Sequence, residues 1–234
     1  MTAVSAPSSP TVRAWDLPTR LFKWTLVLLV VMAPISKNFG DVTLAWHKMN
    51  GYAILTLLLW RLMWGFAGST TARFTSFLTW PTTALNYAGT LFAKGRRYLG
   101  HNPLGGWMVI ALMGILALQG FTGLFVSDDI IVEGPLYNYG SSTWLKLAKV
   151  YHKSLFPLIL LLAAIHIIAN VLYTLVKKEP LIPAMVTGRK PADDYVDAPN
   201  SEGGSPILAL VLLVLSVVVV WGGVYVAAGG GAFR

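Results

Sequence analysis

Three histidines and one lysine in the apolar stretches of the chain have side chains suited to binding a metal. His152 and His166 lie fourteen residues apart in one long apolar stretch, His47 begins another, and Lys23 lies near the start of a third. Fourteen residues make about four turns of an α-helix, so the imidazoles of His152 and His166 face the same side, roughly 21 Å apart along the axis. That separation suits two metal groups at two depths of a bilayer.

The elements that must position these side chains are membrane-spanning helices. Of the 234 residues, 55% are hydrophobic and only 12% are charged, which lies outside the usual range of soluble proteins. Five apolar runs are long enough to cross a bilayer. They are residues 20–37, 47–67, 105–126, 150–176 and 206–228. We therefore expect an all-α integral membrane protein with five spans.

The net charge of +8 comes from basic residues near the ends of these spans. In a membrane protein such clustering is a topology signal, and no nucleic-acid partner is expected from it. The clusters precede the first span, separate the second from the third, and follow the fourth: Arg13, Arg20, Arg73, Lys94, Arg96, Arg97, Lys177, Lys178, Arg189 and Lys190. The positive-inside rule predicts a cytoplasmic N-terminus and a C-terminus on the outer side.

Two connections between the spans have distinctive compositions. Residues 74–98 mix aromatic and aliphatic residues with terminal lysine and arginine, which favours an interfacial amphipathic helix on the inner leaflet. Residues 188–206 are rich in proline, glycine and acidic residues, which is typical of a flexible linker. The predicted division is a four-helix domain at 1–190, a linker at 191–205, and a fifth transmembrane helix with a short tail at 206–234.

The depths of the four candidate ligands favour haem over zinc. His47 and His152 each begin a span on the outer side, so they lie at similar depth, whereas His166 and Lys23 belong to the inner half. A zinc site needs three or four converging ligands, but b-type haem needs only two, one from each of two helices. The chain has no cysteine, so thiolate-held clusters and c-type haem attachment are excluded, and we expect nitrogen or oxygen ligands.

Residues around these positions agree with a haem site. Gly51 lies one helical turn after His47 and leaves room for a porphyrin face. Arg61 lies fourteen residues after His47, hence on the same face and near the depth of His166. A buried arginine there would pair with a haem propionate or a quinone oxygen, and the alternative is that its side chain extends to the inner surface. His101 lies just before the third span, at the inner surface.

Several segments of the chain resemble one family. They are RAWDLPTRLFKW at 13–24, HKMNGYAILTLLLWRLMWGFAG at 47–68, GHNPLGGWMVIALMGILALQGFTGLF at 100–125, YHKSLFPLILLLAAIHIIANVLY at 151–173 and AMVTGRK at 184–190. Together they resemble the bacterial cytochrome b561 family, which includes the b-type subunit of nickel–iron hydrogenases. The resemblance covers about residues 12–190, and its most specific parts are GHNPLGG and MVTGRK.

The resemblance implies a four-helix, di-haem core in the bacterial inner membrane, which moves electrons between membrane quinone and a partner across the membrane. It implies an outer haem b on His47 and His152, and an inner haem b on His166 and a histidine of the first helix. The usual motif for that last ligand is RLFHW, whereas this chain has RLFKW. Lys23 therefore stands where the fourth ligand is expected.

Three arrangements are open at the inner site. In the first and favoured one, Lys23 binds iron as a neutral amine, because burial and the metal both favour the uncharged form. In the second, His101 replaces the missing histidine, although a position near a propionate or quinone suits it better. In the third, the inner haem is five-coordinate or absent, and Lys23 extends to the membrane surface.

The expected function is electron transfer between quinone or quinol and a periplasmic redox partner, such as a c-type cytochrome or a hydrogenase-like enzyme. Arg20, Arg61 and His101 are the candidate quinone contacts, and the outer loop at 127–148 is the candidate docking surface. An alternative is a single-haem or redox-inactive anchor subunit of a larger complex. A transporter is disfavoured because no inverted repeat or broken helix is visible. The oligomeric state is left open, and a homo-oligomer remains compatible with the sequence.

Overall fold

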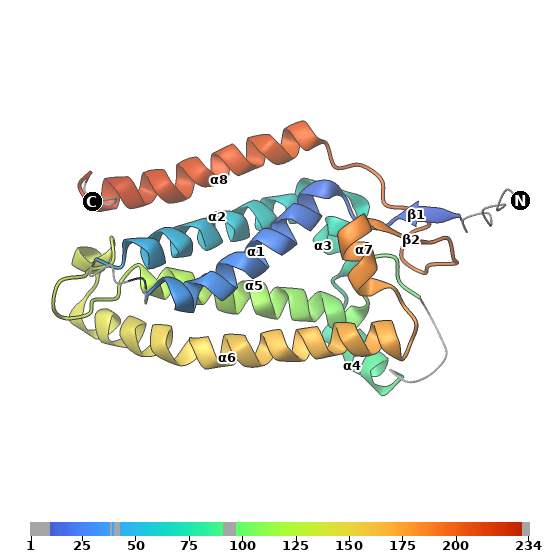
Figure 1. Ribbon diagram of the computed structural model, residues 1–234, viewed down its shortest axis with the longest axis horizontal. Coiled ribbons are helices and arrows are strands. Elements are labelled where there is room, and N and C mark those ends of the chain that lie inside the picture. Colours follow the sequence, from blue (N-terminus) through green and yellow to red (C-terminus); the bar gives the residue numbers. More distant parts are fainter. Residues whose placement is uncertain (1–9, 38, 40–42, 91–96, 231–234) are drawn as a thin grey trace, which may run out of the picture.

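A computed structural model describes residues 10–37, 39, 43–90 and 97–230, and five long helices dominate this part of the chain (Figure 1). The long helices are α1 (Leu17–Ser36), α2 (Ala45–Ala67), α5 (Pro103–Gly123), α6 (Ser142–Leu175) and α8 (Pro206–Ala227). The shorter elements are the strands β1 (Thr11–Arg13) and β2 (Arg189–Pro191), the helices α3 (Phe74–Phe77), α4 (Pro81–Gly89) and α7 (Leu181–Thr187), and the 3-10 turns η1 (Thr70–Ala72) and η2 (Tyr137–Tyr139).

Four of the long helices in the described part are long and apolar enough to cross a membrane, namely α1, α5, α6 and α8. The prediction of an all-α membrane protein is therefore confirmed for four of its five spans. The remaining helix, α2, has 23 residues and enough length, but it carries Arg61 and several polar residues along with its apolar ones. A span at α2 stays a prediction.

Side chains that cap the first turn mark where three of the long helices begin. The side chains of Asp16, Asn102 and Ser141 accept hydrogen bonds from backbone N–H groups in the first turns of α1, α5 and α6. The cap at Ser141 starts α6 eight residues before the predicted residue 150. His152 consequently lies in the third turn of α6 rather than at its beginning, and part of the expected outer loop is helical.

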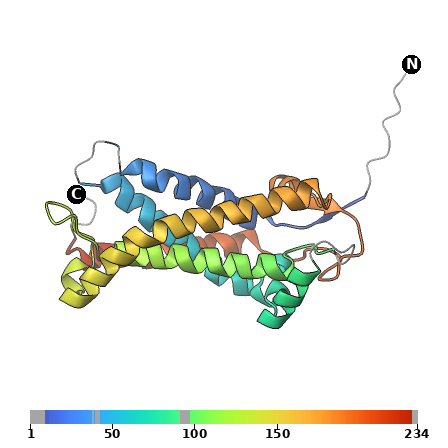
Figure 2. The same ribbon diagram turned by 90° about the horizontal axis from the view of Figure 1, so that it is seen from below.

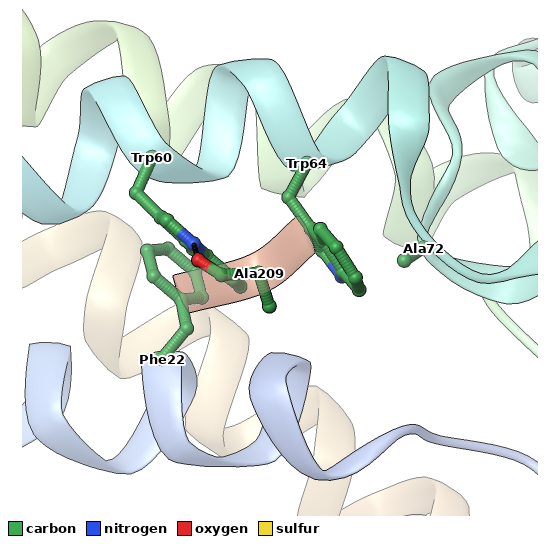
Figure 3. Packing of buried hydrophobic residues seen from close by; sticks show 5 residues of the cluster. All are labelled: Phe22, Trp60, Trp64, Ala72 and Ala209. Carbon is green, nitrogen blue, oxygen red and sulfur yellow. Dashed lines mark hydrogen bonds between the residues drawn. The ribbon is translucent and has the colours of Figure 1, made fainter. Parts of the chain in front are cut away.

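Helix α2 lies at the centre of the bundle, and it packs against α1, α5 and α8, while α6 packs against α5 (Figures 1 and 2). The core between α1, α2 and α8 is aromatic, and it consists of Phe22, Trp60, Trp64, Ala72 and Ala209 (Figure 3). Trp60 stacks on Trp64 with ring centroids 5.5 Å apart, and its indole N–H donates to the Ala209 carbonyl at 2.9 Å. Indole groups of α2 therefore hold the inner half of α8.

The end of the bundle where α1 and α8 begin, called the inner end after the predicted topology, is closed by chain segments far apart in sequence. Strands β1 and β2 pair antiparallel. Residues 191–205, for which composition indicates flexibility, make specific hydrogen bonds: Ser201 N–H donates to the Arg13 carbonyl, and the Asp197 carboxylate accepts from the Leu99 and Gly100 N–H groups. These bonds tie the segment to residues 13, 99 and 100, which precede it in the chain. The division into domains stays a prediction.

The connection between α2 and α5 forms short elements where one interfacial helix is predicted. Helices α3 and α4 are separated by residues 78–80, and Pro81 occupies the first position of α4, where its missing N–H is not needed. The Trp107 indole N–H donates to the Thr79 carbonyl, which fixes this connection against α5. Lys94 and Arg96 lie outside the described residues. A location of 74–98 at the membrane interface stays a prediction.

Candidate functional site

The outer candidate ligands lie opposite each other. The ring centroids of His47 on α2 and His152 on α6 are 6.3 Å apart, and the ring planes make an angle of 85°. An imidazole nitrogen binds a first-row metal at about 2 Å, so two rings on opposite sides of one metal have centroids about 6 Å apart. The spacing therefore fits one metal between the two rings.

Backbone carbonyls set the tautomer of both outer histidines. His47 Nδ1 lies 2.8 Å from the Ala33 carbonyl of α1, and His152 Nδ1 lies 2.9 Å from the Gln119 carbonyl of α5. A carbonyl oxygen only accepts hydrogen bonds, so Nδ1 carries the proton in each ring. The lone pair then belongs to Nε2, which is the nitrogen left for a metal.

Two glycines shape the space around the outer histidines. A Cβ atom at Gly123 would lie 2.8 Å from Cε1 of His152, closer than side-chain atoms pack, so glycine is required where the imidazole crosses α5. A Cβ atom at Gly51 would meet nothing within 4 Å. The free space expected one turn after His47 is therefore present.

We expect a substitution at Gly123 to disturb the outer site selectively. In Gly123→Ala, the added methyl group displaces the His152 ring, and the outer haem content should fall by at least half. Gly222→Ala is the matched control, because a Cβ at Gly222 on α8 meets nothing within 4 Å. Haem per chain in the purified variants measures the effect. Equal haem content in both would mean that this contact does not position His152.

At the inner end, Lys23 contacts residues of the segments that close the bundle. Its Nζ donates a hydrogen bond to Sδ of Met185 on α7 at 3.0 Å, and it lies 4.1 Å from the centre of the Trp15 ring. The second contact has the geometry of a cation–π interaction. Both contacts are made within the protein, and the Lys23 side chain is half-buried.

His166 is held differently from the outer histidines. Its Nε2 lies 3.2 Å from the amide nitrogen of Asn170, one turn later on α6, and the same amide nitrogen donates to the His166 carbonyl at 2.7 Å. An amide nitrogen donates, so Nε2 is the acceptor here. A metal at this nitrogen would replace the Asn170 contact. The structure forms no direct hydrogen bond between His166 and Lys23.

His101 lies between two aromatic rings at the same end. Its ring centroid is 4.9 Å from that of Trp15 and 4.7 Å from that of Phe77. Burial, followed by the positive charge of Lys23, holds the pKa of His101 well below its usual range, so the imidazole is neutral. Its Nδ1 is buried and has no hydrogen-bond partner among the described residues.

Arg61 is buried within the protein, with only 2% of its surface exposed. Its Nη2 donates to the Ala72 carbonyl at 2.9 Å, and its guanidinium lies 5.1 Å from the centre of the Phe74 ring. The segment that follows α2 therefore covers this guanidinium. Its Nη1 is buried without a partner in the described part of the chain.

Arg20 provides a third unsatisfied nitrogen. One end of its guanidinium donates to the Val186 carbonyl of α7, while its Nε is buried without a partner among the described residues. Leaving a buried donor unpaired costs about 1–3 kcal/mol. The unpaired nitrogens of Arg20, Arg61 and His101 therefore fit a ligand that brings acceptor oxygens, such as haem propionates or a quinone. The spacing of His47 and His152 fits haem b, and the unpaired nitrogens at the other end fit its propionates.

Sequence reasoning missed several residues that position the candidate ligands. Gln119 gave a signal, because it is a polar residue within an apolar run, and its side-chain amide also donates to the His152 carbonyl at 3.0 Å. Asp16 gave another as a helix cap before a proline; it is buried and also accepts a hydrogen bond from Ser69. The contact of Trp15 and Met185 with Lys23 gave none, because it joins segments distant in sequence.

Comparison with known proteins gives one match. The family model for prokaryotic cytochrome b561 matches residues 14–188. No curated protein and no solved structure matches the chain. The matched range is well over half of the chain and contains all eight candidate site residues. The chain therefore belongs to the prokaryotic cytochrome b561 family, whose members are membrane b-type cytochromes that bind haem b and transfer electrons.

Proposed function

We propose that this chain holds two b-type haems and transfers electrons between quinone in the membrane and a redox partner on the outer side. The opposed rings of His47 and His152, 6.3 Å apart, carry this proposal. Haem b, when bound, supplies a one-electron carrier. The chain itself supplies the ligands and their orientation.

In the outer site, His47 and His152 would hold the haem iron. The Ala33 and Gln119 carbonyls keep the proton on Nδ1, so both rings present Nε2 without rearrangement. Such second-shell hydrogen bonds orient a ligand and raise its basicity. Gly51 supplies the space beside His47.

In the inner site, His166 and Lys23 are the proposed ligands. His166 would hold the iron through Nε2, in place of its contact with Asn170, and Lys23 would hold it as a neutral amine, in place of its contact with Met185. Arg61, His101 and Arg20 are the proposed contacts for haem propionates and quinone oxygens, since each has a buried nitrogen without a partner among the described residues. A charge-assisted hydrogen bond from either arginine would orient the ligand.

For the topology, we propose that α2 is the fifth span and that the N-terminus is cytoplasmic in a bacterial inner membrane. The outer loop between α5 and α6 would then face the periplasm. It is well formed: the Asp128 carboxylate accepts from the N–H groups of Ile130, Ile131 and Val132, and Asp129 pairs with Lys149. A periplasmic c-type cytochrome or hydrogenase-like protein would bind there.

Haem content tests this function. Protein purified in detergent should contain about two haems per chain, and reduction should produce a b-type α-band. One haem per chain would favour the single-haem alternative, in which the inner site stays empty. A colourless protein that cannot be reconstituted with haem would contradict the proposal and favour a redox-inactive anchor subunit.

A further inference from the structure

Met185 is placed where it can serve as a metal ligand. Its Sδ is 3.0 Å from Nζ of Lys23, so a thioether and an amine lie at one point of the inner site. A methionine thioether is an axial ligand that haem proteins use together with histidine. The lack of cysteine predicts only nitrogen and oxygen donors, and Met185 adds sulfur to that set.

Two side chains of α1 hold Met185 in this position. The Trp24 indole N–H donates to the Met185 carbonyl at 3.2 Å, and the Arg20 guanidinium donates to the next carbonyl, that of Val186. Arg20 and Trp24 lie on either side of Lys23 in α1. The backbone of α7 is therefore fixed against the turn of α1 that carries the lysine.

The end of α7 is fixed as well. Gly188 ends α7 with φ +80°, a left-handed conformation that favours glycine, and a Cβ there would lie 2.8 Å from the Trp15 carbonyl. Ala184, directly before Met185, is fully buried beside Trp15 and Leu99. Helix α7 also packs against α6, the helix that carries His166. Met185 is thus held in place from both sides.

Packing alone does not account for the direction of this side chain. A methionine that fills a core gap places its sulfur among apolar atoms, whereas Met185 directs its sulfur to the amine of Lys23. Lys23, Arg61 and Lys190 bring three basic side chains to this end of the bundle. A neutral thioether supplies a donor at this crowded end without adding charge or requiring the loss of a proton.

We propose that Lys23 and Met185 share one coordination position opposite His166, so that either the amine or the thioether can complete the inner site. This inference rests on the proposed two-haem function. Methionine ligation raises the reduction potential of a haem. The pair would therefore determine the potential of the inner haem, in place of the histidine that the family resemblance leads us to expect at position 23.

Three variants test the shared position: Lys23→Ala, Met185→Leu, and the two combined. Haem per chain, the ferric spectrum, the midpoint potentials and CO binding to the reduced protein are measured for each. Met49→Leu, at an exposed methionine in the second turn of α2, is the matched control. It should match the wild type in all four.

In Lys23→Ala we expect two haems, no CO binding, a thioether signature in the ferric spectrum and a higher potential for one haem. Met185→Leu should keep two haems without that signature. In the combined variant, one of the two haems should lose its sixth ligand, so that CO binds to half of the total haem. Added imidazole should restore six-coordination there.

Two results would overturn the shared position. One is CO binding to half of the haem in Lys23→Ala alone, because Met185 would then have failed to replace the amine. The other is a combined variant that still has two six-coordinate haems, since a different residue, such as His101, would then be the ligand. A wild-type protein with one haem per chain would contradict both the shared position and the two-haem function. Measuring haem in the wild type before any variant is made therefore separates the two failures.

Discussion

Replacing His152 with alanine should remove one haem of the two and leave the other unchanged. The imidazole of His152 faces that of His47 across 6.3 Å, and its Nδ1 is fixed by the Gln119 carbonyl. Without it the outer haem would have one protein ligand and an open side. Haem per chain should fall from about two to about one, and the redox titration should lose one of its two steps.

The control for this prediction is Lys153→Ala. Lys153 is the next residue on α6, and its side chain is exposed, so the substitution tests the helix without touching the site. It should retain both haems. A His152→Ala protein with two six-coordinate haems would contradict the proposed outer site. If His152→Ala loses both haems, its haem content is compared with that of His47→Ala. That variant should also retain the inner haem if the two sites are independent.

Replacing Arg61 with leucine should slow the reaction with quinol and leave the haem content unchanged. Arg61 is buried, and its Nη1 has no partner among the described residues. A hydrogen bond to a charged donor contributes about 1.5–3 kcal/mol. If that bond is formed with quinone in the rate-limiting complex, its loss slows quinol-driven reduction about 10- to 100-fold.

Arg73→Leu is the matched control for Arg61, because Arg73 is an exposed arginine near the same end of α2. Its rate of reduction by quinol should remain within about twofold of the wild type. Since Arg61→Leu also removes the bond to the Ala72 carbonyl, the outer haem spectrum serves as the test of folding. An unchanged rate of reduction by quinol, with an intact spectrum, would show that Arg61 does not contact quinone. Loss of a haem would show instead that Arg61 contacts a haem propionate.

The placement of His152 and His166 on one face of a single helix could be predicted from the sequence, because the helical period is a local property. Fourteen residues between His152 and His166 fix a common face whatever surrounds them. The start of α6 could not be found in this way, since the apolar pattern begins near 150 whereas the cap at Ser141 begins the helix earlier. The first turns of α6 are more polar than the stretch that follows, so the apolar pattern begins inside the helix rather than at its start.

The inner site could be predicted only in part, because its neighbours come from distant segments. Lys23 was recognised from a motif, but its contact with Met185 joins residues 162 positions apart. Composition likewise predicts a flexible segment at 191–205, while hydrogen bonds to residues 13 and 97–100, two of them accepted by the Asp197 side chain, hold it. Such long-range bonds leave no periodic signal in a sequence.

Transfer of electrons across a membrane tests the central claim most directly. Purified protein is placed in vesicles that contain trapped ferricyanide, and ubiquinol and menaquinol are added separately from outside. Reduction of the trapped ferricyanide should be seen with at least one quinol, and it should fall to the protein-free rate in His152→Ala. Vesicles in which the two-haem protein reduces no ferricyanide with either quinol, or in which His152→Ala is as active as the wild type, would contradict the account.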